Sequence, residues 1–60
     1  MTVIIKPINR LDKEVHYRKF EDVASMDDDF FPQIKLRHKD MKHYILMRVP
    51  DNCYLLVIDE

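Results

Sequence analysis

The fold class is decided by one stretch of the sequence, His43-Tyr44-Ile45-Leu46-Met47-Arg48-Val49-Pro50-Asp51-Asn52-Cys53-Tyr54-Leu55-Leu56-Val57-Ile58. It contains two runs that are rich in strand-forming residues, separated by a short turn sequence. Pro50 presets the φ angle that the second position of a type I turn requires, and Asn52 tolerates the left-handed conformation. We therefore predict a β-hairpin of residues 43–49 and 53–58, closed by a three-residue loop.

A second hairpin is predicted just before the first. Residues 33–38 (Gln33-Ile34-Lys35-Leu36-Arg37-His38) alternate between apolar and polar side chains, which is typical of a half-buried strand. Residues 39–42 form the expected turn back into the strand at His43. Residues 1–8 are a further predicted strand, with Pro7 near its end or on an edge.

Residues 10–26 are ambiguous between strand and helix. Their length and lack of breakers allow a helix, but a helical wheel leaves no polar face of useful width. We favour strands in which Val15 and Tyr17 share a face, with a bend over residues 19–22 that turns Phe20 and Val23 inward. Helix remains the alternative.

The two hairpins predict a strand register. A four-residue loop at 39–42 pairs Leu36 with Ile45, and a three-residue loop at 50–52 pairs Met47 with Leu55. Because the side-chain period of a strand is two, both registers place the same apolar set on one face. This predicted core wall consists of Ile34, Leu36, Ile45, Met47, Val49, Cys53, Leu55 and Val57.

The opposite face is expected to carry an apolar part and a basic part. The last predicted strand is apolar on both faces, and a chain of 60 residues has little material with which to bury both of them. We expect self-association, with a dimer favoured, or a protein partner. The residues of this apolar face are Leu46, Tyr54, Leu56 and Ile58.

The basic part is the candidate surface for nucleic acid or for an acidic protein partner. Residues 33–48 contain five Lys or Arg and one Asp, whereas residues 21–29 contain five acidic residues and no basic one. The basic-face residues are Lys35, Arg37, Lys39, Lys42, Tyr44 and Arg48. The competing interpretation is a solvated face that protects the sheet from aggregation.

Composition argues against catalysis and cofactors. The sequence has no glycine, which excludes the phosphate-binding loops of nucleotide-dependent enzymes. A lone Cys53 permits neither a disulfide nor a zinc ribbon, and we read it as a small buried hydrophobe. His38 and His43 can face each other across the hairpin, but we expect a polar rim, with Asp27-Asp28-Asp29 as a solvated turn. We expect no catalytic residue, no metal and no cofactor.

We thus predict one mainly β domain over residues 1–60, an antiparallel meander of four or five strands. It is expected to curl toward a small SH3-like or PH-like barrel, with at most one short helix. Residues 1–7 show neither the basic lead nor the apolar segment of a signal peptide, and no apolar run is long enough for a membrane span. Together with the single thiol, this indicates a cytoplasmic chain.

The spacing of several runs resembles that of short β proteins encoded by bacteriophages and mobile elements. The runs are residues 20–26, the acidic turn after them, residues 34–36, residues 44–46 and residues 54–58. This resemblance implies a small accessory protein that binds a host or phage component, and it carries over no catalytic residue.

Overall fold

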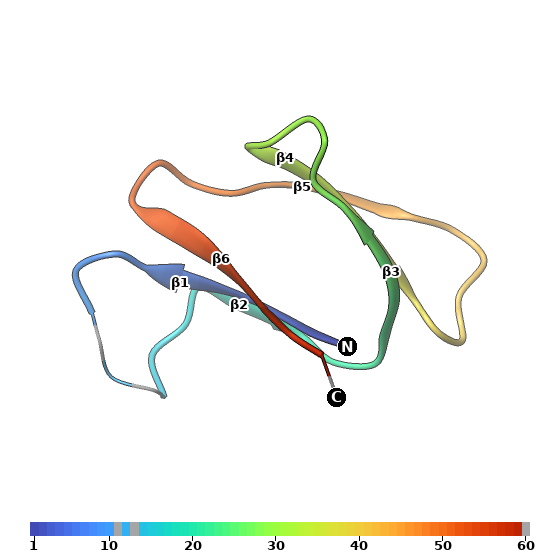
Figure 1. Cartoon of the computed structure of the whole chain (residues 1–60), viewed down its shortest axis with the longest axis horizontal. Coiled ribbons are helices and arrows are strands. Elements are labelled where there is room, and N and C mark those ends of the chain that lie inside the picture. Colours follow the sequence, from blue (N-terminus) through green and yellow to red (C-terminus); the bar gives the residue numbers. More distant parts are fainter. Residues whose placement is uncertain (11, 13, 60) are drawn as a thin grey trace.

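The computed structural model describes residues 1–10, 12 and 14–59 and shows a mainly β protein. The described residues form six strands: β1 (Thr2–Pro7), β2 (Arg18–Phe20), β3 (Val23–Asp27), β4 (Gln33–His38), β5 (Ile45–Arg48) and β6 (Cys53–Ile58). They form two open antiparallel sheets of three strands each, sheet 1 in the order β2-β1-β6 and sheet 2 in the order β3-β4-β5 (Figure 1). The mainly β prediction is confirmed, but the single meander curled into a barrel is wrong.

The hairpin predicted over residues 33–49 forms as expected. In β4 and β5, Ile34 pairs with Met47 and Leu36 pairs with Ile45, which is the predicted register. A backbone bond from the Val49 N–H to the Pro32 carbonyl (2.8 Å) extends the pairing by one step. The alternation of apolar and basic residues was sufficient here, because a shift by one residue would turn Ile34 and Leu36 toward solvent.

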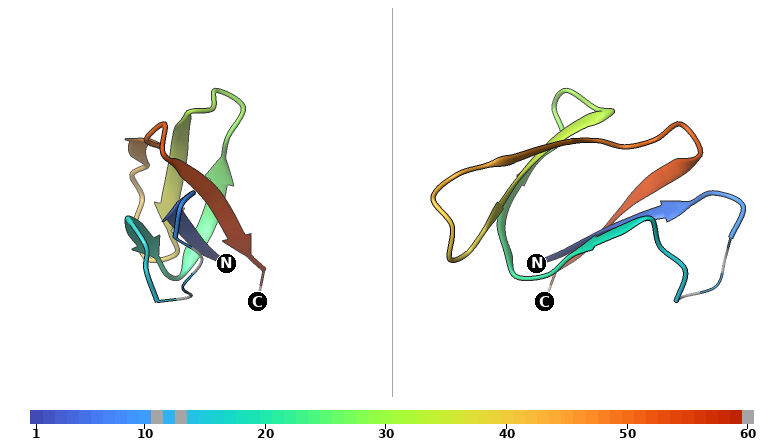
Figure 2. Two further views of the ribbon diagram at one scale, coloured as in Figure 1. Left: turned by 90° about the vertical axis from the view of Figure 1, so that its left-hand side faces the viewer. Right: turned by 180° about the vertical axis from the view of Figure 1, so that it is seen from behind.

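The hairpin predicted over residues 43–58 is wrong. The turn at residues 50–52 exists, with the Cys53 N–H donating to the Pro50 carbonyl at 3.0 Å. It carries the chain from sheet 2 to sheet 1 instead of folding β6 back on β5 (Figure 2). The physical reason is partner length, since β6 pairs along all six residues with β1, whereas β5 offers only four.

Residues 18–20 and 23–27 form strands, as favoured over a helix, and no helix occurs in the described part of the chain. The chain turns the corner between β2 and β3 at Asp22, whose φ of 55° lies in the left-handed region. This bend buries Val23 and packs Phe20 against the core, as predicted. Val15 and Tyr17 precede β2, so the strand face expected for them does not form; Leu11 and Lys13 lie outside the described residues.

The core lies between the two sheets. Its buried side chains come from both sheets and from the connection between them: Val3, Ile5, Val23, Ile34, Leu36, Val49 and Cys53. Of the predicted core wall, Met47 and Leu55 pack against this cluster, but Ile45 and Val57 are 46% and 41% exposed. That part of the prediction is wrong because Ile45 and Val57 lie on different sheets and never pair.

Candidate interaction surfaces

The outer face of sheet 1 carries the exposed side chains of β6. Thr2 pairs with Ile58, Ile4 with Leu56 and Lys6 with Tyr54, so each pair projects on the same side of the sheet. Tyr54, Leu56 and Ile58 remain 38%, 37% and 42% exposed. Leu46, predicted to join them, lies on sheet 2 and is 77% exposed there.

The free edge of β6 is a second feature of the same region. In the described structure no strand pairs with the side of β6 that faces away from β1. The Ile8 N–H donates to the Asn52 carbonyl at 2.8 Å, which continues the β1–β6 ladder. Because hydrogen-bonded and non-hydrogen-bonded pairs alternate, the backbone groups of Leu55 and Val57 then point outward from this edge.

One end of the outer face of sheet 1 is covered by the loop that follows β1. The Lys6 side chain is 6% exposed, and its ammonium donates to the Asp12 carbonyl at 2.9 Å and to the Val15 carbonyl at 2.7 Å. A buried ammonium needs such partners, because desolvation without them is costly. Lys6 therefore fixes the loop over one end of the sheet and leaves Leu56 and Ile58 uncovered.

The outer face of sheet 2 brings together most of the predicted basic residues. Lys35 and Arg37 alternate with the buried Ile34 and Leu36 of β4, and Arg48 follows the half-buried Met47 of β5, so all three project outward. Lys39 and Lys42 instead lie in the β4–β5 loop, where the Lys39 ammonium approaches an Asp22 carboxylate oxygen at 3.8 Å. The face thus holds three of the five predicted cations, and Asp27 is paired with Lys35 in the register.

Tyr44 lies among these cations. The Lys35 ammonium is 4.6 Å from the centroid of the Tyr44 ring, within the range of a cation–π interaction. The pKa of Tyr44 is lowered from its ordinary value, chiefly by the polar Ser25 side chain beside the phenol and next by Arg37. Burial opposes this shift, and the positive charges of Arg37 and Lys35 add smaller contributions that lower the pKa. The phenol therefore lies close to Ser25 of β3 and to Lys35 and Arg37 of β4.

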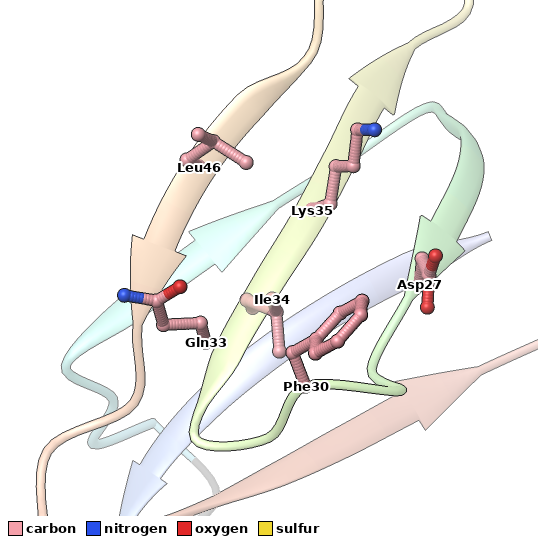
Figure 3. A pocket seen from close by; sticks show the side chains of 6 residues that line it. All are labelled: Asp27, Phe30, Gln33, Ile34, Lys35 and Leu46. Carbon is pink, nitrogen blue, oxygen red and sulfur yellow. The ribbon is translucent and has the colours of Figure 1, made fainter.

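A second aromatic side chain lies at the other end of this face, and the sequence did not reveal it. Two turn bonds, from the Phe31 N–H to the Asp28 carbonyl and from the Gln33 N–H to the Phe30 carbonyl, leave Phe30 79% exposed. Phe30 borders a depression of about 220 Å³ that is also lined by Asp27, Gln33, Ile34, Lys35 and Leu46 (Figure 3). Only the tight turn places it there, because residues 28–32 show no strand alternation.

The polar groups considered for metal binding or catalysis have local structural contacts. The His38 Nδ1 accepts a hydrogen bond from the Asp40 N–H at 3.1 Å, and Cys53 is buried in the core. Asp27, Asp28 and Asp29 lie exposed in a turn, with carboxylate oxygens within 4.8 Å of one another. The Asp27 Oδ1 accepts from the Asp29 N–H at 2.9 Å, which is an ordinary turn contact.

Comparisons with known proteins return no match to any family model, curated protein or solved structure. In the part of the chain that the structure describes, no helix is long and apolar enough to cross a membrane. Functional inference therefore depends on the two outer faces and the β6 edge.

Proposed function

We propose that this chain is a non-enzymatic protein-interaction module that self-associates by antiparallel pairing of β6 with β6 of a second copy. The observation that carries the proposal is the combination of a free edge with an uncovered apolar strand. Tyr54, Leu56, Val57 and Ile58 are each between 37% and 42% exposed, and β6 contains neither a charge nor a proline. Long apolar edges of this kind are templates for strand addition.

The other edge strands differ from β6 in having protective features. β2 is only three residues long and carries Arg18 and Lys19. β3 has an irregularity between Val23 and Ser25 and ends in Asp27, and β5 has four residues and ends in Arg48. Short length, charge and bulges all discourage pairing at an edge. Among the described strands, β6 is therefore the edge best suited to accept a partner.

The ladder geometry selects a register for the dimer. Since the backbone groups of Leu55 and Val57 point outward, these residues must form the hydrogen-bonded pairs of a new antiparallel ladder. Pairing Leu55 with Val57 of the second copy places Leu56 opposite its own counterpart on the two-fold axis. Cys53, whose N–H is already bonded to Pro50, then stays outside the ladder. This arrangement joins the two outer faces through Tyr54, Leu56 and Ile58.

The non-enzymatic part of the proposal is supported by the form of the surface. Of the six residues that line the depression beside Phe30, five are exposed. A second depression of about 240 Å³ contains Lys19, Glu21 and His38, but the Lys19 ammonium pairs with Glu21 at 3.3 Å on an exposed surface. Catalytic groups work best in concave sites that exclude water.

Sedimentation equilibrium over a range of protein concentrations tests self-association. The Leu56→Lys substitution removes two partly exposed leucines from the dimer and places like charges opposite each other. We estimate a cost of about 2–3 kcal/mol, which weakens the dimer roughly 30- to 160-fold. The matched control is Leu46→Lys, the same substitution on the other sheet, which should leave the dissociation constant unchanged. A monomer at all concentrations, or equal effects of both substitutions, would overturn the proposal.

Oxidative cross-linking tests the register separately. In a Cys53→Ala background, Leu56→Cys places two thiols at a non-hydrogen-bonded pair on the two-fold axis, where the Cα separation is about 4.5 Å. We expect a rapid disulfide-linked dimer from this variant and none from Leu46→Cys. A dimer by mass that cross-links through neither thiol would reject this register while retaining self-association.

A further inference from the structure

The outer face of sheet 2 has a composition that the proposed dimer does not use. It combines two exposed aromatic rings, Phe30 and Tyr44, with three cations and the Asp27 carboxylate, which lies within 4.8 Å of the carboxylates of Asp28 and Asp29 in the adjoining turn. It belongs to a different sheet from the β6 edge, so both surfaces are available in one molecule. We propose that this face binds single-stranded nucleic acid, with bases stacking on Phe30 and Tyr44 and phosphates contacting Lys35, Arg37 and Arg48.

The aromatic side chains supply the stacking surfaces. Phe30 is 79% exposed and Tyr44 is 49% exposed, so neither ring is needed to fill the core. The two rings are held differently, Phe30 by the turn bonds on either side of it and Tyr44 by its contact with Lys35. Every base has a flat π face, so exposed aromatic rings can stack on unpaired bases of almost any identity.

Lys35 occupies the middle of the surface. Its ammonium contacts the Tyr44 ring at 4.6 Å, and its side chain also lines the depression beside Phe30 (Figure 3). Arg37 and Arg48 lie on the same face, where the Arg37 guanidinium donates to the Met41 carbonyl at 3.2 Å and the exposed Arg48 guanidinium is 4.0 Å from an Asp51 carboxylate oxygen. Three cations beside two rings match the alternation of phosphates and bases in a single strand.

Asp27 gives the surface a base preference. Its carboxylate lines the same depression as Phe30, and in the described part of the chain its Oδ1 accepts a hydrogen bond from the Asp29 N–H. A carboxylate accepts hydrogen bonds and repels phosphate, so at this position it favours a base that carries an exocyclic amino group. We therefore expect oligo-dC to bind more tightly than oligo-dT.

The competing occupant is an acidic peptide, which would use the same three cations. Such a peptide offers no flat π face to Phe30 and Tyr44 and would be repelled by Asp27. The exposed aromatic pair therefore favours the nucleic acid, and the peptide becomes an outcome of the test.

Fluorescence anisotropy with labelled oligo-dC, oligo-dT, oligo-rC, a duplex and polyglutamate tests the proposal at low salt. We expect oligo-dC or oligo-rC to bind best, and Phe30→Ala and Tyr44→Ala each to weaken binding roughly 5- to 150-fold. The matched control is Tyr17→Ala, since Tyr17 is 48% exposed and its ring centroid lies 5.5 Å from the Arg18 guanidinium, but it directly precedes β2 of sheet 1. Tyr17→Ala should leave the affinity for the oligonucleotides unchanged.

Salt and charge variants complete the test. Binding through three cations predicts a slope of about −2 in a plot of log affinity against log salt concentration, and Arg48→Met should reduce it to about −1.4. Asp27→Asn, which keeps the Oδ1 acceptor of the turn, should reduce the difference in binding affinity between oligo-dC and oligo-dT. Absence of binding to all single strands, tighter binding of duplex or polyglutamate, or an equal loss in Tyr17→Ala would overturn the proposal.

Discussion

Replacing Lys6 by Met tests whether a buried ammonium holds the loop over sheet 1. Methionine keeps the apolar stem of the side chain but removes the donors to the Asp12 and Val15 carbonyls, at 2.9 and 2.7 Å. A hydrogen bond to a charged group contributes about 1.5–3 kcal/mol, and the released carbonyls recover part of this by hydration. We therefore expect the free energy of unfolding to fall by about 2–4 kcal/mol.

This loss is large for so small a chain. At about 0.05–0.15 kcal/mol per residue, 60 residues have a total stability of only about 3–9 kcal/mol. A domain of this size loses about 4–8 °C in Tm for each kcal/mol, so Lys6→Met should melt at least about 8 °C lower.

Urea denaturation measures the loss, and Lys39→Met is the matched control. The Lys39 side chain is 59% exposed and pairs with Asp22 at 3.8 Å, so its replacement should cost no more than about 1 kcal/mol. Both variants should be compared at a concentration where sedimentation gives them the same mass. If Lys6→Met is no less stable than Lys39→Met, the ammonium does not hold the loop and the reasoning is refuted.

Two further predictions concern the corner at Asp22 and the phenol of Tyr44. Because Asp22 has a φ of 55°, Asp22→Asn should leave stability nearly unchanged, whereas the β-branched Asp22→Val should cost about 1–2 kcal/mol in urea denaturation. Equal stabilities of the two variants would contradict a left-handed corner. Ser25→Ala and Arg37→Met should each raise the pKa of Tyr44 toward its ordinary value, because they remove groups that favour the phenolate. Ultraviolet titration against a Tyr44→Phe reference measures this pKa. The pKa of Tyr44 is lower in the folded chain than in the unfolded chain, so ionisation of Tyr44 stabilises the fold. This stabilisation is complete above the ordinary tyrosine pKa and is lost as the pH falls through the pKa of the folded chain. An unchanged titration midpoint in both variants would show that neither group acts on the phenol.

The interaction surfaces were only partly predictable. The alternation in residues 33–38 placed Lys35 and Arg37 on one outer face, and the apolar character of residues 53–58 indicated a strand that its own chain does not fully cover. The sequence also predicted Leu46 beside Tyr54, which the structure separates onto two sheets. Phe30 was missed because its exposure comes from turn hydrogen bonds, which leave no periodic pattern.

Sequence by itself determined the strands and the local β4–β5 hairpin, because alternation and turn residues act over a few positions and a one-residue slip would expose the core. Only the tertiary structure decided that β6 leaves β5 and pairs with β1, close to fifty residues away in the chain. The Pro50–Asn52 turn allows β6 to pair with either β5 or β1. Pairing with β1 is favoured because it gives the longer ladder and lets both sheets share one core. That choice also leaves the far side of β6 as a free edge, and with it the surface on which self-association is proposed.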